Sequence, residues 1–337
     1  MEKVKLSLNK VDFSPVGLFK NGHFQTIYNA LFYKPVDLKD TKKIEIKIDS
    51  KNTIICDYNK SIENITKTLV ILVHGLEGSA QSNYIVSTAQ KLYKKGFSVL
   101  RMNIRNCGGT SHLSETLYNA GLSDDVKKVI DFFIEKYDYK NIFTAGFSLG
   151  ANTVLKMAGE YSNKYPEELK GVIAISPPLD LSECSEAIIL PRNIIYDDHY
   201  RKRLIKTYKN KKKFYPENVD IGLIKKIKNL KDFDDYITGP AFGYKDAEEY
   251  YKLNSSLRFL SEINLYTLII QSQDDPIIPF NSTIKAMNLN NENLHFLITK
   301  HGGHVGFINS FSASKNDIDR RWAENRVVEF VEEYLKS

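Results

Sequence analysis

The chain has 337 residues, of which 42% are hydrophobic and 26% are charged. This length is enough to bury a large core, and the composition is that of a globular protein, which excludes a collagen-like, disordered or linker-dominated chain. Lys and Arg outnumber Asp and Glu by 47 to 41, an excess too small to indicate a nucleic-acid-binding protein. We therefore expect a folded protein without a nucleic-acid partner.

Cysteine usage and the first residues bear on the compartment. The three cysteines, Cys56, Cys107 and Cys184, include no CxxC pair, so neither a disulfide framework nor a thiolate zinc site is predicted. The first seven residues lack the apolar run of a signal peptide. The longest strongly apolar run, residues 69–73, is much shorter than a membrane helix needs. We expect a cytoplasmic protein that does not span a bilayer and that could still touch one at its surface.

Short apolar or β-branched runs, bounded by turn residues, predict eight strands. In chain order they cover residues 43–48, 53–58, 69–73, 98–102, 142–145, 171–175, 266–271 and 294–299. Helical patterns cover residues 80–95, 124–137, 149–161, 282–288 and 317–335. Strands that alternate with helices predict a mostly parallel sheet covered by helices on both faces.

Residues 177–261 interrupt this alternation with helical and loop-like sequence. We therefore predict an N-terminal extension over 1–40, a core over 41–176 and 262–337, and a helical cap over 177–261 that follows the sixth strand. Within the cap, residues 192–231 carry 13 Lys or Arg against 4 Asp or Glu. Such a cationic face could rest on an anionic membrane surface, although solvated surface charge explains the same composition.

A candidate nucleophile lies in the sequence Gly-Phe-Ser-Leu-Gly at residues 146–150. This G-x-S-x-G motif stands between a predicted strand and a predicted helix, where a sharp turn presents the serine hydroxyl clear of the sheet. Gly146 and Gly150 leave room for neighbouring backbone at such a turn. The motif predicts that Ser148 is a nucleophile, and the alternative is a tight turn that contains a serine by chance.

A nucleophilic serine needs a base, and the base needs an orienting acid, in the chain order serine, acid, histidine. Asp274 and Asp275 follow the seventh predicted strand, and His301 and His304 follow the eighth, at strand ends where open α/β sheets place their sites. We favour Asp275, which directly precedes a Pro-Ile-Ile-Pro turn. We favour His304, because two preceding glycines let the loop carry it over the sheet edge. A metal site at the two histidines is the weaker alternative, since no third ligand lies near them in sequence.

Backbone donors for an oxyanion are expected from two loops. One is the N–H of Leu149, directly after the serine, and the other is the N–H of Leu76 in the sequence His-Gly-Leu-Glu-Gly-Ser at residues 74–79. Gly75 permits a tight loop there, and we expect His74 to hold that loop rather than to act as a second base. The sequence contains no glycine-rich phosphate-binding motif, so no nucleotide cofactor is predicted.

Together with further motifs, these residues resemble the YheT-like family of α/β-hydrolases, whose members include bacterial esterases and eukaryotic lipid hydrolases. The resemblance covers nearly the whole chain. It rests on Asn21 to Thr26 (NGHFQT), His74 to Ser79, Gly146 to Asn152, Phe233-Asp234, Gly243-Tyr244, Tyr250-Tyr251 with Ser255, Asp274 to Pro276 and Gly302 to Phe307. Two departures are Asn106, where the family pattern has glycine, and Asn119, where it has histidine.

The resemblance implies an α/β-hydrolase fold and a serine hydrolase that cleaves short- to medium-chain or lipid carboxylic esters. Ser148, Asp275 and His304 would act through an acyl-enzyme intermediate, and this mechanism needs no metal or organic cofactor. The alternatives are an acyltransferase with an alcohol acceptor, an amidase or peptidase, and a non-catalytic binding protein on the same fold. The sequence does not indicate the physiological substrate or the oligomeric state.

Overall fold

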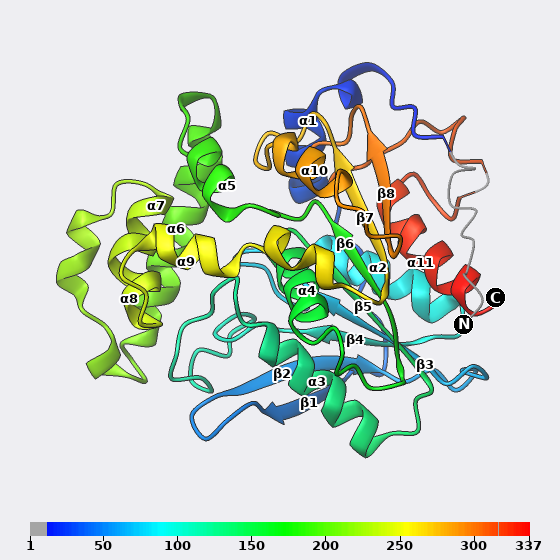
Figure 1. The fold of residues 1–337 in the computed structure, drawn as a ribbon, viewed down its shortest axis with the longest axis horizontal. Helices are drawn as coiled ribbons and strands as arrows, with labels where there is room; N and C mark the ends of the chain where they lie inside the picture. Colours follow the sequence, from blue (N-terminus) through cyan, green and yellow to red (C-terminus); the bar gives the residue numbers. More distant parts are fainter. Residues whose placement is uncertain (1–11, 316) are drawn as a thin grey trace.

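The computed structural model describes residues 12–315 and 317–337. Within them, eight strands form one sheet in the order β1-β2-β4-β3-β5-β6-β7-β8. The strands are β1 (Lys42–Lys47), β2 (Thr53–Asn59), β3 (Thr68–Val73), β4 (Ser98–Met102), β5 (Asn141–Phe147), β6 (Leu169–Ile175), β7 (Tyr266–Ser272) and β8 (Leu294–Thr299). β2 pairs antiparallel with both β1 and β4, and all other neighbours are parallel. The predicted mostly parallel, eight-stranded sheet is confirmed (Figure 1).

Helices cover both faces of the sheet, because its central strands are apolar on both sides. In β3, Leu69, Ile71 and Val73 pack into one core cluster, while Val70 and Leu72 pack into the other. The first cluster includes α3 (Ser123–Lys136), α4 (Leu149–Glu160) and α10 (Phe280–Met287), and the second includes α2 (Asn83–Lys94) and α11 (Trp322–Tyr334). Burial on both faces fixes the strands firmly, which gives a rigid support for loops at their ends.

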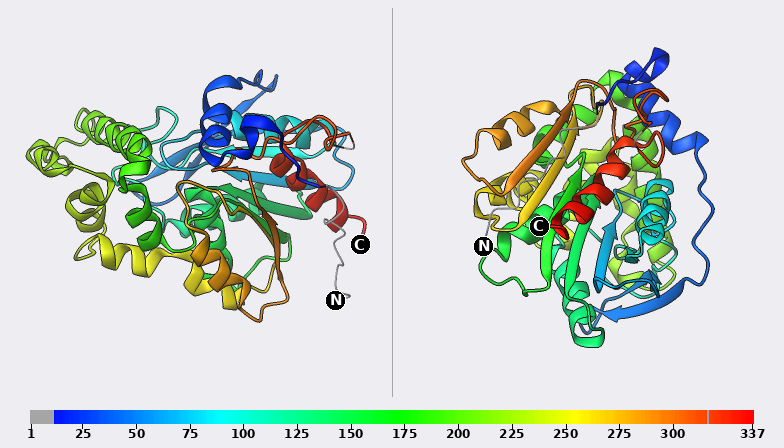
Figure 2. Two further views of the ribbon diagram at one scale, coloured as in Figure 1. Left: turned by 90° about the horizontal axis from the view of Figure 1, so that it is seen from above. Right: turned by 90° about the vertical axis from the view of Figure 1, so that its right-hand side faces the viewer.

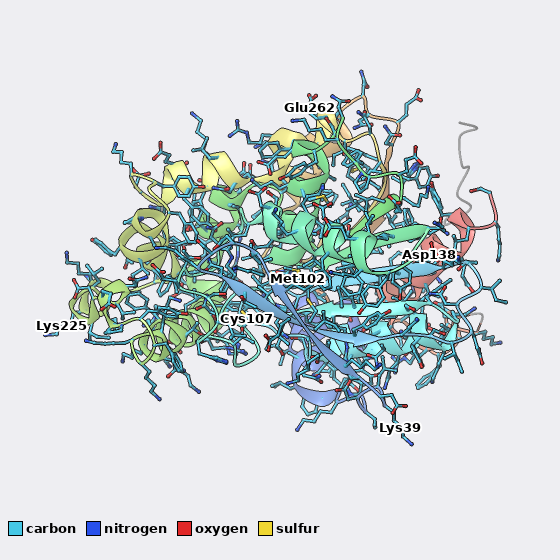
Figure 3. The ribbon with its side chains drawn as sticks, turned by 90° about the horizontal axis from the view of Figure 1, so that it is seen from below. Lys39, Met102, Cys107, Asp138, Lys225 and Glu262 are labelled. Atoms are coloured by element: carbon cyan, nitrogen blue, oxygen red, sulfur yellow. The ribbon has the colours of Figure 1, made fainter. Side chains whose placement is uncertain are left out.

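Between β6 and β7 the chain leaves the sheet and forms a helical insertion. All residues of this insertion lie in the described part of the chain, and none of them forms a strand. Its helices are α5 (Leu181–Ile188), α6 (Ile194–Lys211), α7 (Leu230–Phe233), α8 (Gly239–Ala241) and α9 (Ala247–Asn254), with a π-helical turn η6 (Asp234–Thr238). The insertion extends beyond one end of the sheet (Figures 1 and 2). Met102, the last residue of β4, lies on the side of the sheet toward Lys225 of the insertion, and Asp138, which precedes β5, lies at the opposite end (Figure 3). The insertion therefore stands at the C-terminal ends of the parallel strands.

The structure corrects three helix predictions. α2 begins at Asn83 rather than at residue 80, because Ser82 Oγ and Asn103 Oδ1 accept the N–H groups of residues 79 and 80 and hold them in a turn. α11 begins at Trp322 rather than at residue 317, because Arg321 forms a β-bridge to Ile308.

The third correction is helix α1 (Gly22–Phe32), which follows the 3-10 turn η2 (Gly17–Lys20) and is absent from the predicted elements. The side chain of Asn21 caps it by accepting the N–H of Phe24. The helix lies within the predicted extension 1–40, whose first eleven residues are outside the described part of the chain.

Two further features concern the cysteines and the membrane. Cys56, Cys107 and Cys184 are buried free thiols. None of the helices in the described part of the chain is both long and apolar enough to cross a bilayer.

Candidate active site

Ser148 occupies a strained turn between β5 and α4, with φ 53° and ψ −124°. A positive φ is uncommon for a residue with a Cβ and persists only where the surroundings enforce it. The surroundings of this turn are tightly packed. A Cβ added to Gly146 would lie 2.3 Å from the carbonyl oxygen of Gly150, and a Cβ added to Gly150 would lie 2.4 Å from the carbonyl oxygen of Val73. Two glycines thus let strand and helix pass in close contact while Ser148 stands at the N-terminus of α4.

Hydrogen bonds connect Ser148, His304 and Asp275 in series. His304 Nε2 lies 2.8 Å from Ser148 Oγ, and His304 Nδ1 lies 2.9 Å from Asp275 Oδ2. The other carboxylate oxygen of Asp275 accepts the N–H groups of Ile277 and Ile278 at 2.8 and 2.9 Å. With Nδ1–H donating to this fixed carboxylate, a neutral imidazole presents the lone pair of Nε2 to the serine hydroxyl.

Asp274 and His301 form a second, looser pair beside this series. His301 Nδ1 lies 3.4 Å from Asp274 Oδ2, and Asp274 Oδ1 accepts the N–H of Gly303 at 2.9 Å. Asp274 therefore braces the loop that carries His304, while Asp275 contacts the imidazole itself.

Helix α1 holds the loop at residues 304–308. Thr26 Oγ1 accepts the N–H of His304 at 2.8 Å. The side-chain amide of Gln25 bonds both backbone groups of Ile308, at 2.8 Å to the N–H and 3.1 Å to the carbonyl oxygen. Sequence patterns alone indicate no role for these two residues, although both belong to the NGHFQT segment that carries the resemblance. Through these contacts the NGHFQT segment holds the loop that carries His304.

His74 braces the loop at residues 74–79. The imidazole is fully buried, with Nδ1 2.7 Å from the carbonyl oxygen of Gly75 and Nε2 accepting the N–H of Ile104 at 3.1 Å. Burial lowers the pKa of His74 to about 4, so the ring is neutral at physiological pH. A Cβ added to Gly75 would lie 2.9 Å from the Cβ of Ser148. The loop backbone thus passes directly beside Ser148, and Leu76 is the next residue of that loop.

Two cavities meet at Ser148. Four residues line both of them: Leu76, Ser148, Tyr200 and His304. The first, the apolar cavity, encloses about 930 Å³ including its mouth, with walls formed largely by Leu117, Leu181, Ile188, Leu204, Leu230, Phe233, Ile277 and Ile278. The second, the polar cavity, encloses about 1020 Å³ including its mouth, with walls that include Thr26, Asn29, Ser79, Gln81, Ser82, Asn83 and Arg203. The serine therefore lies where an apolar space meets a more polar one.

One carboxyl group lies in the wall of the apolar cavity. Asp234, on the π-helical turn η6, accepts the hydroxyl hydrogen of Tyr251 at 2.6 Å. Burial raises the pKa of Asp234 to about 6, so the carboxyl changes its charge in the mildly acidic range.

The two departures from the family pattern are accommodated locally. Asn106 has φ 65°, a left-handed conformation that asparagine tolerates better than most residues. Its side chain donates to the carbonyl oxygen of Thr116 at 2.7 Å and accepts from Lys211 Nζ of α6 at 2.8 Å. Asn119 accepts the N–H of Gly121 at 2.6 Å. Asparagine at these positions therefore keeps the loop backbone in place.

No group of three or more His, Cys, Asp or Glu side chains that could hold a metal ion occurs in the part of the chain that the structure describes. His301 and His304 instead face Asp274 and Asp275.

The fold and this geometry define a class of protein. A model of the alpha/beta hydrolase fold family matches residues 68–311, which is more than half of the chain, and the chain belongs to that family.

Individual relatives extend the match. The chain is 26% identical over 332 residues to the protein of Escherichia coli (strain K12) provisionally named esterase YheT, covering 98% of this chain and 95% of that one. It is 29% identical over 273 residues to a monoacylglycerol lipase of Saccharomyces cerevisiae, covering 79% of this chain and 59% of the lipase. The resemblance to the YheT-like hydrolases is thereby confirmed.

Among solved structures, the esterase Pf2001 of Pyrococcus furiosus shares the fold with a TM-score of 0.57 at 18% identity. The structural match covers 90% of this chain and 98% of the esterase.

Proposed function

We propose that the protein is a serine hydrolase that cleaves carboxylic esters, with Ser148 as nucleophile, His304 as general base and acid, and Asp275 as the orienting carboxylate. The observation that carries this proposal is the series of hydrogen bonds of 2.9 and 2.8 Å from Asp275 through His304 to Ser148. Membership of the hydrolase family, and relatives named as an esterase and a monoacylglycerol lipase, support the class of carboxylic ester hydrolases.

The reaction follows from the roles of these groups. His304 Nε2 takes the proton of Ser148 as its oxygen attacks the ester carbonyl, and Asp275 stabilises the imidazolium that forms. The N–H groups of Leu76 and Leu149 would donate to the oxyanion. His304 then protonates the departing alcohol, and afterwards activates a water molecule that releases the acid from Ser148.

The two cavities divide the substrate between them. An acyl chain favours the apolar cavity, because burial of each methylene group from water contributes about 0.8 kcal/mol. The alcohol then occupies the polar cavity, where the hydroxyl and amide groups of Ser79, Ser82 and Asn83 can pair with it. We infer a substrate whose acyl part is apolar and whose alcohol part is polar.

The test combines covalent labelling with substrate hydrolysis. A fluorophosphonate probe should label the wild-type protein at Ser148, and Ser148→Ala should abolish labelling and lower kcat by a factor on the order of 10⁶. p-Nitrophenyl esters from acetate to palmitate, together with a monoacylglycerol and a phospholipid, would define the acyl and alcohol preferences. More than a tenth of wild-type activity in Ser148→Ala would refute the assignment. A labelled protein that prefers amides or transfers its acyl group to added alcohols would revise the reaction class.

A further inference from the structure

Glu77 is a buried acid in the loop at residues 74–79, directly after the proposed oxyanion donor Leu76. Its residue surface is 8% exposed, and its backbone has φ 54°. An acid at such a position must be held by partners, because both the left-handed backbone and the burial of a carboxylate are unfavourable by themselves.

The partners of Glu77 come from two other parts of the chain. The hydroxyl of Tyr118 donates to Oε1 at 2.8 Å and accepts the N–H of Glu77 at 3.0 Å. On helix α6 of the insertion, Thr207 Oγ1 donates to Oε2 at 2.9 Å, and the guanidinium of Arg203 donates to the carbonyl oxygen of Glu77 at 2.5 Å. Both carboxylate oxygens, the N–H and the carbonyl oxygen of this one residue are thus engaged.

These contacts bear on the serine through the backbone. Gly75 lies directly against Ser148, and Glu77 lies two residues further on, so the position of the Leu76 N–H is fixed between the two. Leu76, Tyr118 and Thr207 also line the apolar cavity together. A shift of α6 away from the core would therefore remove the contacts of Thr207 and Arg203 to Glu77 and leave those of Tyr118.

We propose that Glu77 is a positioning residue that holds the N–H of Leu76 in place as an oxyanion donor, and that docking of α6 completes this hold. The inference rests on the proposed function of Ser148 and Leu76. In this arrangement the insertion supplies part of the geometry of the oxyanion site, in addition to a wall of the apolar cavity.

The first experiment uses Glu77→Gln. This change replaces one carboxylate oxygen by an NH₂ group, which cannot accept from Tyr118 or Thr207. We expect kcat to fall about 10- to 100-fold, while KM changes less than about threefold. This fall in kcat is somewhat smaller than the fall expected from complete loss of one oxyanion donor. The affinity for an acyl trifluoromethyl ketone, which forms an oxyanion with the serine, should fall by a similar factor, and that for the unreactive parent ketone should not change. The matched control is Glu217→Gln, an exposed acid of the insertion.

A second pair of variants covers the case in which Glu77→Gln fails to fold. Thr207→Val removes the donor on α6 while keeping the side-chain shape, and Thr207→Ser keeps the donor. We expect Thr207→Val to lower kcat and trifluoromethyl ketone affinity together, and Thr207→Ser to restore both.

Two outcomes would overturn the positioning role: unchanged trifluoromethyl ketone affinity in a folded Thr207→Val or Glu77→Gln protein, or no restoration by serine. Failure of the proposed function is recognised separately, since the wild-type protein would then resist the fluorophosphonate probe.

Discussion

The backbone N–H of His304 donates a 2.8 Å hydrogen bond to Oγ1 of Thr26, a residue 278 positions earlier in the chain. The hydroxyl of Thr26 in turn donates to the carbonyl oxygen of Gly22 at 2.8 Å, which fixes its direction. The loop of the proposed base is therefore held by the N-terminal helix α1 as well as by the sheet.

This contact predicts an effect on catalysis from outside the reacting groups. Thr26→Val keeps the side-chain shape but leaves the N–H of His304 without its acceptor, so we expect kcat to fall between about 10- and 100-fold through misplacement of the imidazole. Thr26→Ser should retain most activity. Steady-state kinetics of the two variants, with thermal unfolding to confirm that both are folded, make the comparison. Equal activity of the two would show that the contact does not position His304.

A second prediction concerns the two Asp and the two His residues. Asp275→Asn and His304→Ala should each lower kcat by several orders of magnitude, because they remove the orienting acid and the base. Asp274→Asn and His301→Ala should lower kcat far less, because these two residues brace the loop and are not part of the hydrogen-bonded series that reaches Ser148. Esterase rates of the four variants provide the ranking. The reverse ranking would move the acid or the base by one motif position.

The third prediction is a pH dependence of stability. The pKa of His74 is lowered from 6.5 to about 4 by burial, so between these values the unfolded chain binds a proton that the folded chain does not. The free energy of unfolding should therefore decrease as the pH falls from 6.5 to 4, with His74 contributing about 3 kcal/mol at most. In His74→Gln this decrease should be smaller.

Urea denaturation at several pH values between 7 and 4 measures this effect. His112→Gln, at an exposed histidine, serves as the control and should follow the wild-type curve. A pH dependence of His74→Gln identical to that of the wild type would contradict the prediction.

The fourth prediction concerns the basic segment at residues 192–231, which we propose contacts anionic membranes. Lys211 is buried and bonded to the loop at Asn106, so it cannot take part, whereas Lys212, Lys213 and Phe214 are exposed at the end of α6. We expect binding to vesicles that contain phosphatidylserine but not to pure phosphatidylcholine. It should weaken as salt rises, because exposed charges are screened over about 8 to 10 Å at physiological ionic strength.

Co-sedimentation of the protein with vesicles tests this segment against a matched charge change. The double variant Lys212→Glu/Lys213→Glu should lose binding, while Lys42→Glu/Lys43→Glu on the edge strand β1 should retain it. Equal binding to both vesicle types, or none at low salt, would leave the segment as ordinary solvated surface.

The sheet could be predicted because most of its strands are short, apolar or β-branched, and bounded by turn residues; β3, buried at every position, is the clearest case. Candidate site residues could be chosen because Ser148, Asp275 and His304 each follow a parallel strand, and such strand ends meet at one edge of the sheet. Their catalytic roles remain a prediction.

Other features depend on contacts between distant parts of the chain. The polar residues of helix α1 find their partners in the loop at His304, far along the chain, so no local pattern indicates their role. The hydrogen bond between Thr207 of α6 and Glu77 likewise joins residues that are 130 positions apart, and no local sequence pattern indicates it. Sequence periodicity predicts elements, whereas these links depend on how the elements pack.

The two cavities at Ser148 have a consequence for the order of events in a turnover. They share Leu76, Ser148, Tyr200 and His304, and their other walls differ. An alcohol that departs through the polar cavity vacates the space beside His304 while the acyl chain still fills the apolar one. Water can then enter from the side that the first product has left, without competing with the acyl chain for passage. Under the proposed mechanism the alcohol would leave the polar cavity before the acid leaves the apolar one, so bulk added to the acyl chain should slow release of the acid more than release of the alcohol.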